Sequence, residues 1–128
     1  MNSMREILFR GKFIKTSTWV YGHFVESEGV CFIYSKNENN RWMVHEVIPD
    51  SVGQATWFMD KKNVHIFEKD KCDVVLASGR HVHAFVVFVD GCFELHFVSP
   101  IEINHQYNDR DYLKCHTINH AVEVIPED

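Results

Sequence analysis

The sequence predicts a mainly β protein: an antiparallel meander packed with a small SH3-like or barrel-like β unit, with at most one short helix. Apolar and polar residues alternate with a period of two along most of the chain, and β-branched and aromatic residues fill the alternating segments. Short clusters of Gly, Asn and Ser separate these segments. Because 128 residues are the usual length of one domain, we expect a single domain over residues 1–128, with the meander at about 5–48 and the barrel-like part at about 66–125.

Four segments with this alternating pattern build the predicted meander. They are residues 5–10, 19–25, 30–34 and 41–48. The polar run 36–40 favours a tight turn before the last of them, and Pro49 ends that segment because proline cannot donate a hydrogen bond to a neighbouring strand. Antiparallel pairing of neighbours that are joined by such short loops gives a meander.

The strongest local signal is a β-hairpin over residues 80–99. Two runs rich in Val and Phe flank Asp90-Gly91, the preferred pair for a two-residue type I′ turn. The register predicted from this turn pairs Val89 with Cys92, Val87 with Glu94 and Phe85 with His96. One face of the hairpin is then wholly apolar and is predicted to face the core; it consists of Ala84, Val86, Phe88, Phe93, Leu95 and Phe97. A slip of one residue would bury Glu94 and two histidines, so the pattern specifies the register.

The C-terminal part predicts the only helix and the last strand. The helix is expected over residues 108–117, with Asp109 as its cap. Residues 120–125 alternate again and end before Pro126, which is typical of a final strand.

The composition argues against a nucleic-acid partner and against a membrane protein. Thirteen Lys and Arg against 18 Asp and Glu give a formal charge of -5, and no stretch concentrates cations as phosphate binding requires. No segment approaches the roughly 18 apolar residues of a membrane span, and residues 1–10 lack the apolar stretch of a signal peptide. The four cysteines, Cys31, Cys72, Cys92 and Cys115, form no disulfide or metal motif, which favours reduced thiols in a cytoplasmic protein.

One candidate metal site lies on the outer face of the hairpin. Its residues are His81, His83, Glu94 and His96. A His-x-His pair on a strand points both imidazoles to one side, and His96 lies diagonal to His83 across the ladder. Imidazoles with a carboxylate are a ligand set that zinc or iron accepts, so a metal-dependent enzyme is one hypothesis. The interpretation that we favour is a half-exposed sheet face, without metal or cofactor, in which histidines pair with aromatic and acidic neighbours.

A Cys/His hydrolase is a further enzymatic hypothesis, which would use Cys115 with His116 or His120. Adjacent residues rarely present a nucleophile and a base to each other, and no nucleophile signature surrounds any cysteine. The sequence also has no glycine-rich phosphate loop and no zinc-protease motif. We therefore expect no catalytic residues.

The aromatic residues offer two interpretations. Trp19, Tyr21, Trp42, Trp57 and ten Phe would suit either stacking on nucleic-acid bases or packing in the core and in protein interfaces. Because no cations are interleaved with them along the sequence, we favour core and interface packing.

Three stretches of the chain carry the main motifs of a known family. Residues 4–12 read MREILFRGK, residues 19–22 read WVYG, and residues 47–70 read VIPDSVGQATWFMDKKNVHIFEKD. These stretches resemble the YopX family of phage and prophage proteins, whose members show a Met-Arg-Glu-Ile-x-Phe-Arg start, Trp-Val-Tyr-Gly, and then Val-Gly-Gln, Tyr-Thr-Gly, Asp-Lys-Asn-Gly-Lys and Ile-Phe-Glu-Gly-Asp. VVFVDGCF at 86–93 and VEVI at 122–125 look like the later strands of the family. The resemblance therefore runs through most of the chain.

The chain departs from the family pattern at four positions. Ala55 stands where the family has Tyr, and Trp57, Asn63 and Lys69 stand where it has Gly. Asn63 is a tolerable replacement because Asn accepts the left-handed backbone region. The resemblance implies a mainly β fold and a phage or prophage origin, and it supplies no catalytic residues.

The leading functional hypothesis is a non-enzymatic phage or prophage accessory protein that binds a host or phage protein through a β surface, in the cytoplasm of the bacterial host cell. Open strand edges and surplus aromatics favour self-association into a homo-oligomer. The first alternative is a nucleic-acid-binding or regulatory module, and the second is a metal-dependent enzyme at the face of His81, His83 and His96.

Overall fold

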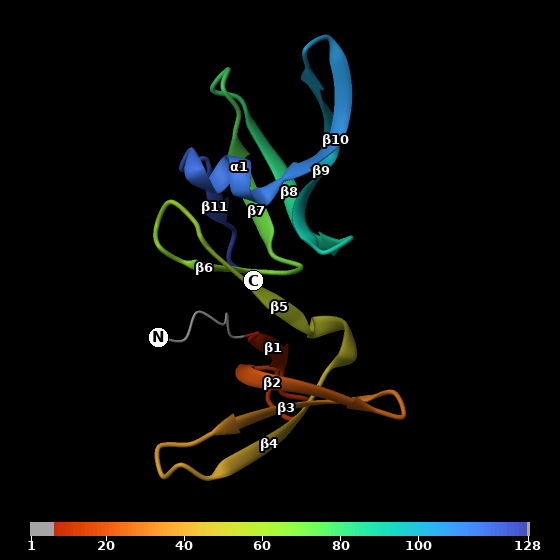
Figure 1. Ribbon diagram of the computed structural model, residues 1–128, viewed down its shortest axis with the longest axis vertical. Helices are drawn as coiled ribbons and strands as arrows, with labels where there is room; N and C mark the ends of the chain where they lie inside the picture. Colours follow the sequence, from red (N-terminus) through yellow and green to blue (C-terminus); the bar gives the residue numbers. More distant parts are fainter. Residues whose placement is uncertain (1–6, 128) are drawn as a thin grey trace. The chain divides into compact units, whose positions relative to one another are not determined.

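The computed structural model describes residues 7–127, and almost all of its regular structure is antiparallel β (Figure 1). In chain order the elements are β1 (Phe9–Lys12), β2 (Trp19–Ser27), β3 (Val30–Lys36), β4 (Trp42–Val47), the one-turn 3-10 helix η1 (Pro49–Ser51), β5 (Gly53–Met59), β6 (His65–Phe67), β7 (Lys71–Val75), β8 (His81–Val89), β9 (Cys92–Ile103), β10 (Gln106–Tyr112), α1 (Leu113–Ile118) and β11 (Val122–Val124). The prediction of a mainly β fold with at most one short helix is confirmed. The chain divides between Ala55 and Thr56 into two compact units, called unit 1 and unit 2 below.

Unit 1 is an antiparallel meander whose ends meet. Strands β1 to β4 pair in chain order, and β5 pairs with the other side of β1. The chain after β1 also returns to β4, because Ile14 N–H donates to the Glu46 carbonyl (3.0 Å) and Ile48 N–H donates to the Lys12 carbonyl (2.9 Å). These bonds close β1 to β4 into a small barrel. The first strand was predicted at 5–10, of which residues 5 and 6 lie outside the described range.

The core of unit 1 is formed by the inward-facing residues of these strands. Its members are Cys31, Ile33 and Val47, with Phe9, Val20, Phe24 and Val52 packed against them. Gly22 permits the tight curvature of β2, since a Cβ atom there would lie 2.1 Å from the Tyr34 carbonyl oxygen. Such a distance is impossible for any residue with a side chain, so β2 and β3 approach each other at Gly22 only because it is glycine.

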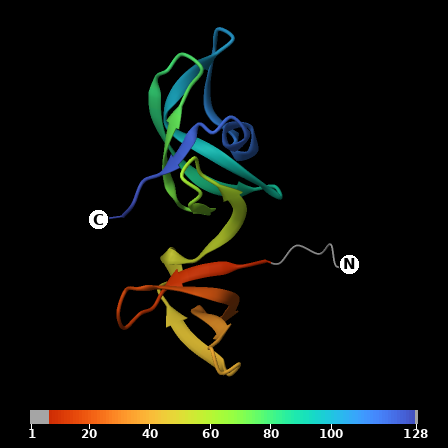
Figure 2. The ribbon, with the colours of Figure 1, turned by 90° about the vertical axis from the view of Figure 1, so that its left-hand side faces the viewer.

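Unit 2 contains a five-stranded antiparallel sheet in the order β10-β9-β8-β7-β11 (Figures 1 and 2). The predicted hairpin is its centre: Asp90 and Gly91 have φ of 50° and 80°, and β8 and β9 pair in the predicted register. That register includes Val89 with Cys92, Val87 with Glu94 and Phe85 with His96. We expected a barrel-like arrangement over 66–125, whereas the strand pairing there is that of an open sheet with β10 and β11 at its edges, and the closed ring lies in unit 1.

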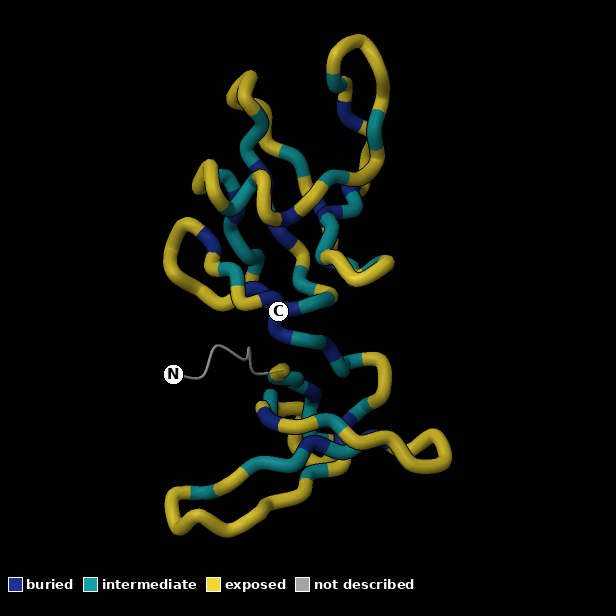
Figure 3. Tube along the Cα trace, viewed as in Figure 1, coloured by how far each residue is buried: buried dark blue, intermediate teal, exposed yellow. Residues whose placement is uncertain are grey.

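The apolar face of the hairpin forms most of the core of unit 2. The buried members of this core are Ile66, Cys72, Val74, Ala84, Val86, Leu95, Phe97, Ile101, Leu113 and Val122. Buried and exposed segments alternate along these strands in Figure 3. Phe88 departs from the prediction: it lies on the apolar face but is 42% exposed, because it sits two residues from the turn at the end of the sheet.

The helix prediction over 108–117 is wrong in its first half. Residues up to Tyr112 belong to β10, which pairs with the long strand β9, and α1 begins only at Leu113. Asp109 therefore lies in a strand, and the residue at the helix N-cap, Tyr112, makes no side-chain capping bond. Strand β5 was not predicted either. The final strand, predicted at 120–125, is observed as β11.

Candidate functional site

The structure separates the four predicted metal ligands into two groups, each with its own carboxylate. In the first group, His81 Nδ1 lies 2.8 Å from Asp73 Oδ2, and His83 Nε2 lies 3.8 Å from Asp73 Oδ1. Asp73 is on β7, where it stands directly opposite His83. The sequence reasoning missed this carboxylate because it did not pair β7 with β8.

The second group is built on β9 and β10. His96 Nε2 lies 3.0 Å from Glu94 Oε1, and Arg110 Nη1 lies 3.7 Å from the same oxygen. His96 stands opposite the half-exposed Phe85. Within residues 7–127, no group of three or more His, Cys, Asp or Glu side chains has an arrangement that would hold a metal ion. The face thus carries two local histidine–carboxylate groups beside an aromatic ring.

Of the residues of the hydrolase hypothesis, His116 and His120 line one pocket beside β7, and Cys115 is not among the residues that line it. His116 Nε2 lies 3.1 Å from Asp111 Oδ2, and its ring packs edge-on against Phe97. Cys115 is exposed on the neighbouring position of α1, and His120 follows the helix with a φ of 55°. The Asp111 contact orients His116 toward β10.

All four cysteines are free thiols, and two of them are buried. Burial, together with the smaller effect of the negative charges of Asp70 and Asp60, raises the pKa of the Cys72 thiol to about 12. A thiol with such a pKa stays protonated at neutral pH and is a poor nucleophile.

Residues 53–70, which we call the central motif, make up most of the stretch 47–70 described in the sequence analysis, and their polar side chains stabilise turns. Buried Thr56 donates its hydroxyl to the Ile66 carbonyl (2.7 Å) and accepts from Phe58 N–H (3.1 Å). Asp70 accepts a hydrogen bond from Phe67 N–H (2.8 Å). These side chains satisfy backbone groups in the turns around β6, which explains the need for short polar residues there.

Asp60 has the largest structural role in this motif. Its side chain is buried, and one carboxylate oxygen accepts hydrogen bonds from Lys62 N–H (2.8 Å) and Val64 N–H (2.9 Å). The other oxygen accepts from Val124 N–H (2.9 Å), 64 residues along the chain. Asp60 therefore joins the turn after β5 to the last strand, β11.

The most distinctive exposed surface lies on the outside of unit 1. We call it the aromatic face; it consists of His23 and Val25 on β2, Phe32, Tyr34 and Lys36 on β3, and Trp42, Val44 and Glu46 on β4. Strand pairing arranges these residues in three cross-strand rows. The middle row is His23, Tyr34 and Val44. The row at one end is Lys36 and Trp42, and the row at the other end is Val25, Phe32 and Glu46. The alternation of each strand puts them on the side opposite the core.

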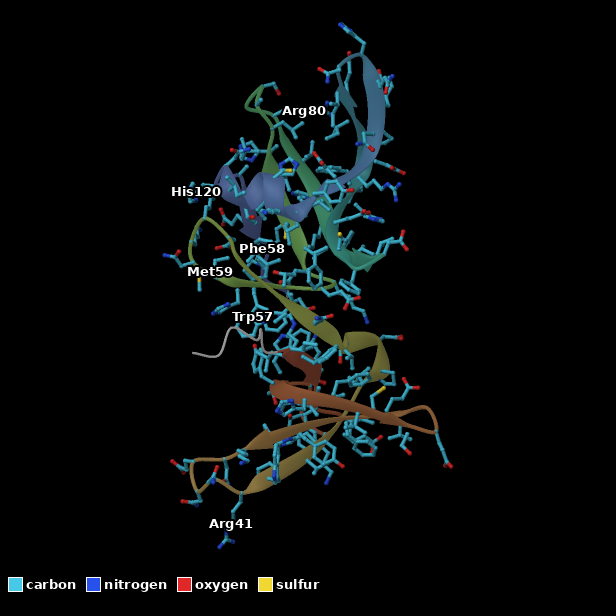
Figure 4. All side chains as sticks on the ribbon, in the orientation of Figure 1. Arg41, Trp57, Phe58, Met59, Arg80 and His120 are labelled. Atoms are coloured by element: carbon cyan, nitrogen blue, oxygen red, sulfur yellow. The ribbon has the colours of Figure 1, made fainter. Side chains whose placement is uncertain are left out.

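The aromatic face exposes much apolar surface. Trp42 is 55% exposed, Val44 50% and Val25 42%. His23, Val25, Tyr34 and Trp42 line a shallow apolar hollow of about 430 Å³. Lys36 holds its ammonium group 5.0 Å from the centre of the Trp42 ring. The β3–β4 hairpin that carries this hollow ends at the turn where Figure 4 labels Arg41.

Cations do accompany aromatic rings in unit 1, contrary to the expectation from the linear sequence. On β1 and β2, the Arg10 guanidinium lies 4.0 Å from the centre of the Trp19 ring, and the Lys12 ammonium lies 5.2 Å from it. Strand pairing causes this arrangement, because Lys12 stands directly opposite Trp19 in the β1–β2 ladder. Arg10 and Lys12 lie nine and seven positions before Trp19, and it is the pairing of β1 with β2 that brings them over its ring.

The fold and this surface define a mainly β chain of two compact units, one of which presents an aromatic sheet face. Comparison with known protein families, with curated proteins and with solved structures gave no match for this chain. Between residues 7 and 127, no helix has the length and apolar character that a membrane-spanning helix needs.

Proposed function

We propose that this chain is a non-enzymatic binding module that recognises a protein partner through the aromatic face. The observation that carries the proposal is the exposed apolar surface of Trp42, Val44 and Val25, of which Trp42 and Val25 line the hollow. Contiguous exposed apolar surface marks interaction sites, and Trp and Tyr side chains dominate the binding energy of protein interfaces. A hollow lined by apolar groups suits an apolar side chain of the partner.

We propose further that the module is a YopX-like accessory protein of a phage or prophage that acts in the cytoplasm of the host cell. The backbone supports this family assignment at the three positions where the family has glycine. Trp57, Asn63 and Lys69 have φ of 64°, 62° and 78°, the left-handed region that glycine occupies without strain. A chain that keeps a family's turns while losing its glycines would show this pattern.

Paired variants of β4 test the protein-binding proposal. Val44→Asp places a charge on the aromatic face, whereas Met43→Asp places the same charge on the neighbouring residue, which is also exposed but points to the opposite side of β4. Tagged wild-type and variant proteins are used to capture partners from lysate of bacteria that also express the untagged chain, and the captured proteins are quantified by mass spectrometry. We expect capture by the wild type and by Met43→Asp, and its loss with Val44→Asp. Equal capture by both variants would contradict the proposal.

Single-stranded nucleic acid is a second candidate ligand, favoured by the cations that lie over Trp19 and Trp42. Single-strand binders combine aromatic stacking platforms with positive charge along the backbone path. Fluorescence anisotropy with labelled oligo-dT at low and moderate salt tests this candidate. Binding that weakens steeply with salt and is lost with Trp42→Ala would support it, and no binding at low salt would exclude it.

A further inference from the structure

We propose that the partner of the aromatic face is a second copy of this chain, packed face to face about a two-fold axis. The axis would run along the middle row of the face, formed by His23, Tyr34 and Val44. This inference rests on the proposed function, because it names the partner of the same surface.

The charges of the aromatic face are arranged for pairing with itself. Lys36 lies in the row at one end, beside Trp42, and Glu46 lies in the row at the other end, beside Phe32. The middle row carries no lysine, arginine or carboxylate. A two-fold interface brings the same patch of both subunits together, so it requires a patch that is complementary to its own rotated image.

Rotation about the middle row satisfies this requirement. The rotation reverses the direction of each strand, so the Lys36–Trp42 row of one copy faces the Phe32–Glu46 row of the other. Each strand then lies opposite its own copy, so Lys36 faces Phe32 of the second copy and Trp42 faces Glu46 of the second copy. The Lys36 ammonium reaches Glu46 of the second copy diagonally, across one strand spacing of about 4.8 Å. Each contact occurs twice, once on each side of the axis. The two rows are four residues apart along β3, roughly 13 Å, and packed sheets lie about 10 Å apart, which long side chains can bridge.

A second copy explains the face better than a polyanion does. A nucleic acid would gain from Lys36 but would meet the carboxylate of Glu46 in the same patch. A second copy compensates both charges and covers the exposed surfaces of Trp42 and Val44 at once. Charge complementarity of this kind fixes the orientation of an interface and suppresses other partners.

Charge reversal at the two ends of the face tests the dimer. Sedimentation velocity across the micromolar range should give twice the monomer mass of 15.0 kDa for the wild type. Lys36→Glu and Glu46→Lys each bring like charges together on this diagonal and should raise the dimer Kd by at least about tenfold. The double variant K36E/E46K restores opposite charges and should return the Kd to within about threefold of the wild-type value. Lys15→Glu, an exposed lysine outside the aromatic face, is the control and should leave the Kd unchanged.

Each outcome has a defined meaning. A strict monomer across the concentration range overturns the dimer, and so does a dimer whose Kd responds to neither reversal or is not restored by the double variant. If the wild type is monomeric while Val44→Asp still abolishes capture of another protein, the dimer fails and the proposed protein-binding function stands. If oligo-dT binds the monomer and only Lys36→Glu abolishes that binding, the ligand is a nucleic acid and the dimer is overturned. Circular dichroism melting of each variant verifies that it is folded.

Discussion

At the scale of single residues, Lys69 stores backbone strain. Its φ of 78° forces an L-residue into the left-handed region, and its N–H donates to the Val86 carbonyl (2.7 Å), which holds the turn in place. Glycine adopts this conformation without steric cost, although it also increases the entropy of the unfolded chain. We expect Lys69→Gly to raise the free energy of unfolding by about 0.5–1 kcal/mol, measured by urea denaturation.

The control for this substitution is Lys15→Gly. Lys15 is an exposed turn residue without a positive φ. Glycine there brings only the entropic cost and should lower the free energy of unfolding slightly. A destabilising effect of Lys69→Gly as large as that of Lys15→Gly would show that the turn at Lys69 is not strained.

The thiol of Cys72 should be chemically inert in the folded protein. Its pKa is raised to about 12 by burial, whereas the reference value for an exposed thiol is 9.0. We expect a thiol reagent at pH 8 to modify the exposed Cys92 and Cys115 rapidly, and to modify Cys72 only after unfolding. Mass spectrometry of the labelled peptides measures this, and rapid labelling of Cys72 in the native protein would refute it.

The same shift has a consequence for stability at high pH. Between about pH 9 and pH 12 the unfolded thiol has lost its proton while the folded one retains it. The folded state then binds more protons, so this group lowers the free energy of unfolding as the pH rises through that window. The contribution of the Cys72 thiol to the free energy of unfolding is fully present below pH 9.

At the scale of elements, Asp60 should be the most sensitive position of the central motif. Its buried carboxylate accepts three backbone hydrogen bonds, from Lys62, Val64 and Val124. Asp60→Ala leaves these N–H groups without their acceptor, and we expect it to lower the free energy of unfolding by about 3 kcal/mol or more. Thermal and urea denaturation measure the change. Asp109→Ala, at an exposed site, should change stability by less than about 0.5 kcal/mol, and an equally small effect at Asp60 would contradict this role.

The elements that were predicted well are those that local chemistry determines. The Asp90-Gly91 turn fixes its own register, because type I′ geometry requires positive φ at both positions. Residues 108–112 were predicted as the first half of a helix and instead belong to β10, because they pair with Ile101 and then with residues 94–96 of β9 rather than with the local chain. Tertiary pairing thus overrides the local signal where the sequence is polar and ambiguous.

The candidate site was only partly predictable for a similar reason. The alternation of β2 separates Trp19, Tyr21 and His23 from Val20 and Phe24, but it does not say which side faces the core. That choice depends on the closure of β4 onto the end of β1, which involves residues more than thirty positions apart. The cation–π contacts of Arg10 with Trp19 and of Lys36 with Trp42 follow from the β1–β2 and β3–β4 pairings, which the composition of the sequence does not specify.

At the scale of the whole molecule, the net charge resides in unit 2. Unit 1 contains six Lys or Arg and six Asp or Glu, whereas unit 2 contains seven against twelve, which accounts for the total of -5. A neutral unit carries the aromatic face, so no long-range repulsion opposes the approach of two copies of unit 1 through it.

The nine histidines should give the protein a solubility minimum near pH 6. Full protonation of all nine would change the formal charge from -5 to +4, and the sequence pI is about 6.0. Proteins without net charge associate and precipitate most readily. Light scattering from pH 5 to pH 8 should show the strongest aggregation around pH 6, and a monotonic trend across that range would refute the prediction.

The carboxylate of Asp60 also sets an order of events during synthesis. Unit 1 draws its strands from residues that leave the ribosome before position 60, so its barrel can assemble while the rest of the chain is still being translated. Unit 2 must wait, since one oxygen of this carboxylate lacks its backbone donor until Val124 has emerged. A nascent chain stalled short of that valine would therefore carry a finished first half and an unfinished second half, vulnerable to proteases.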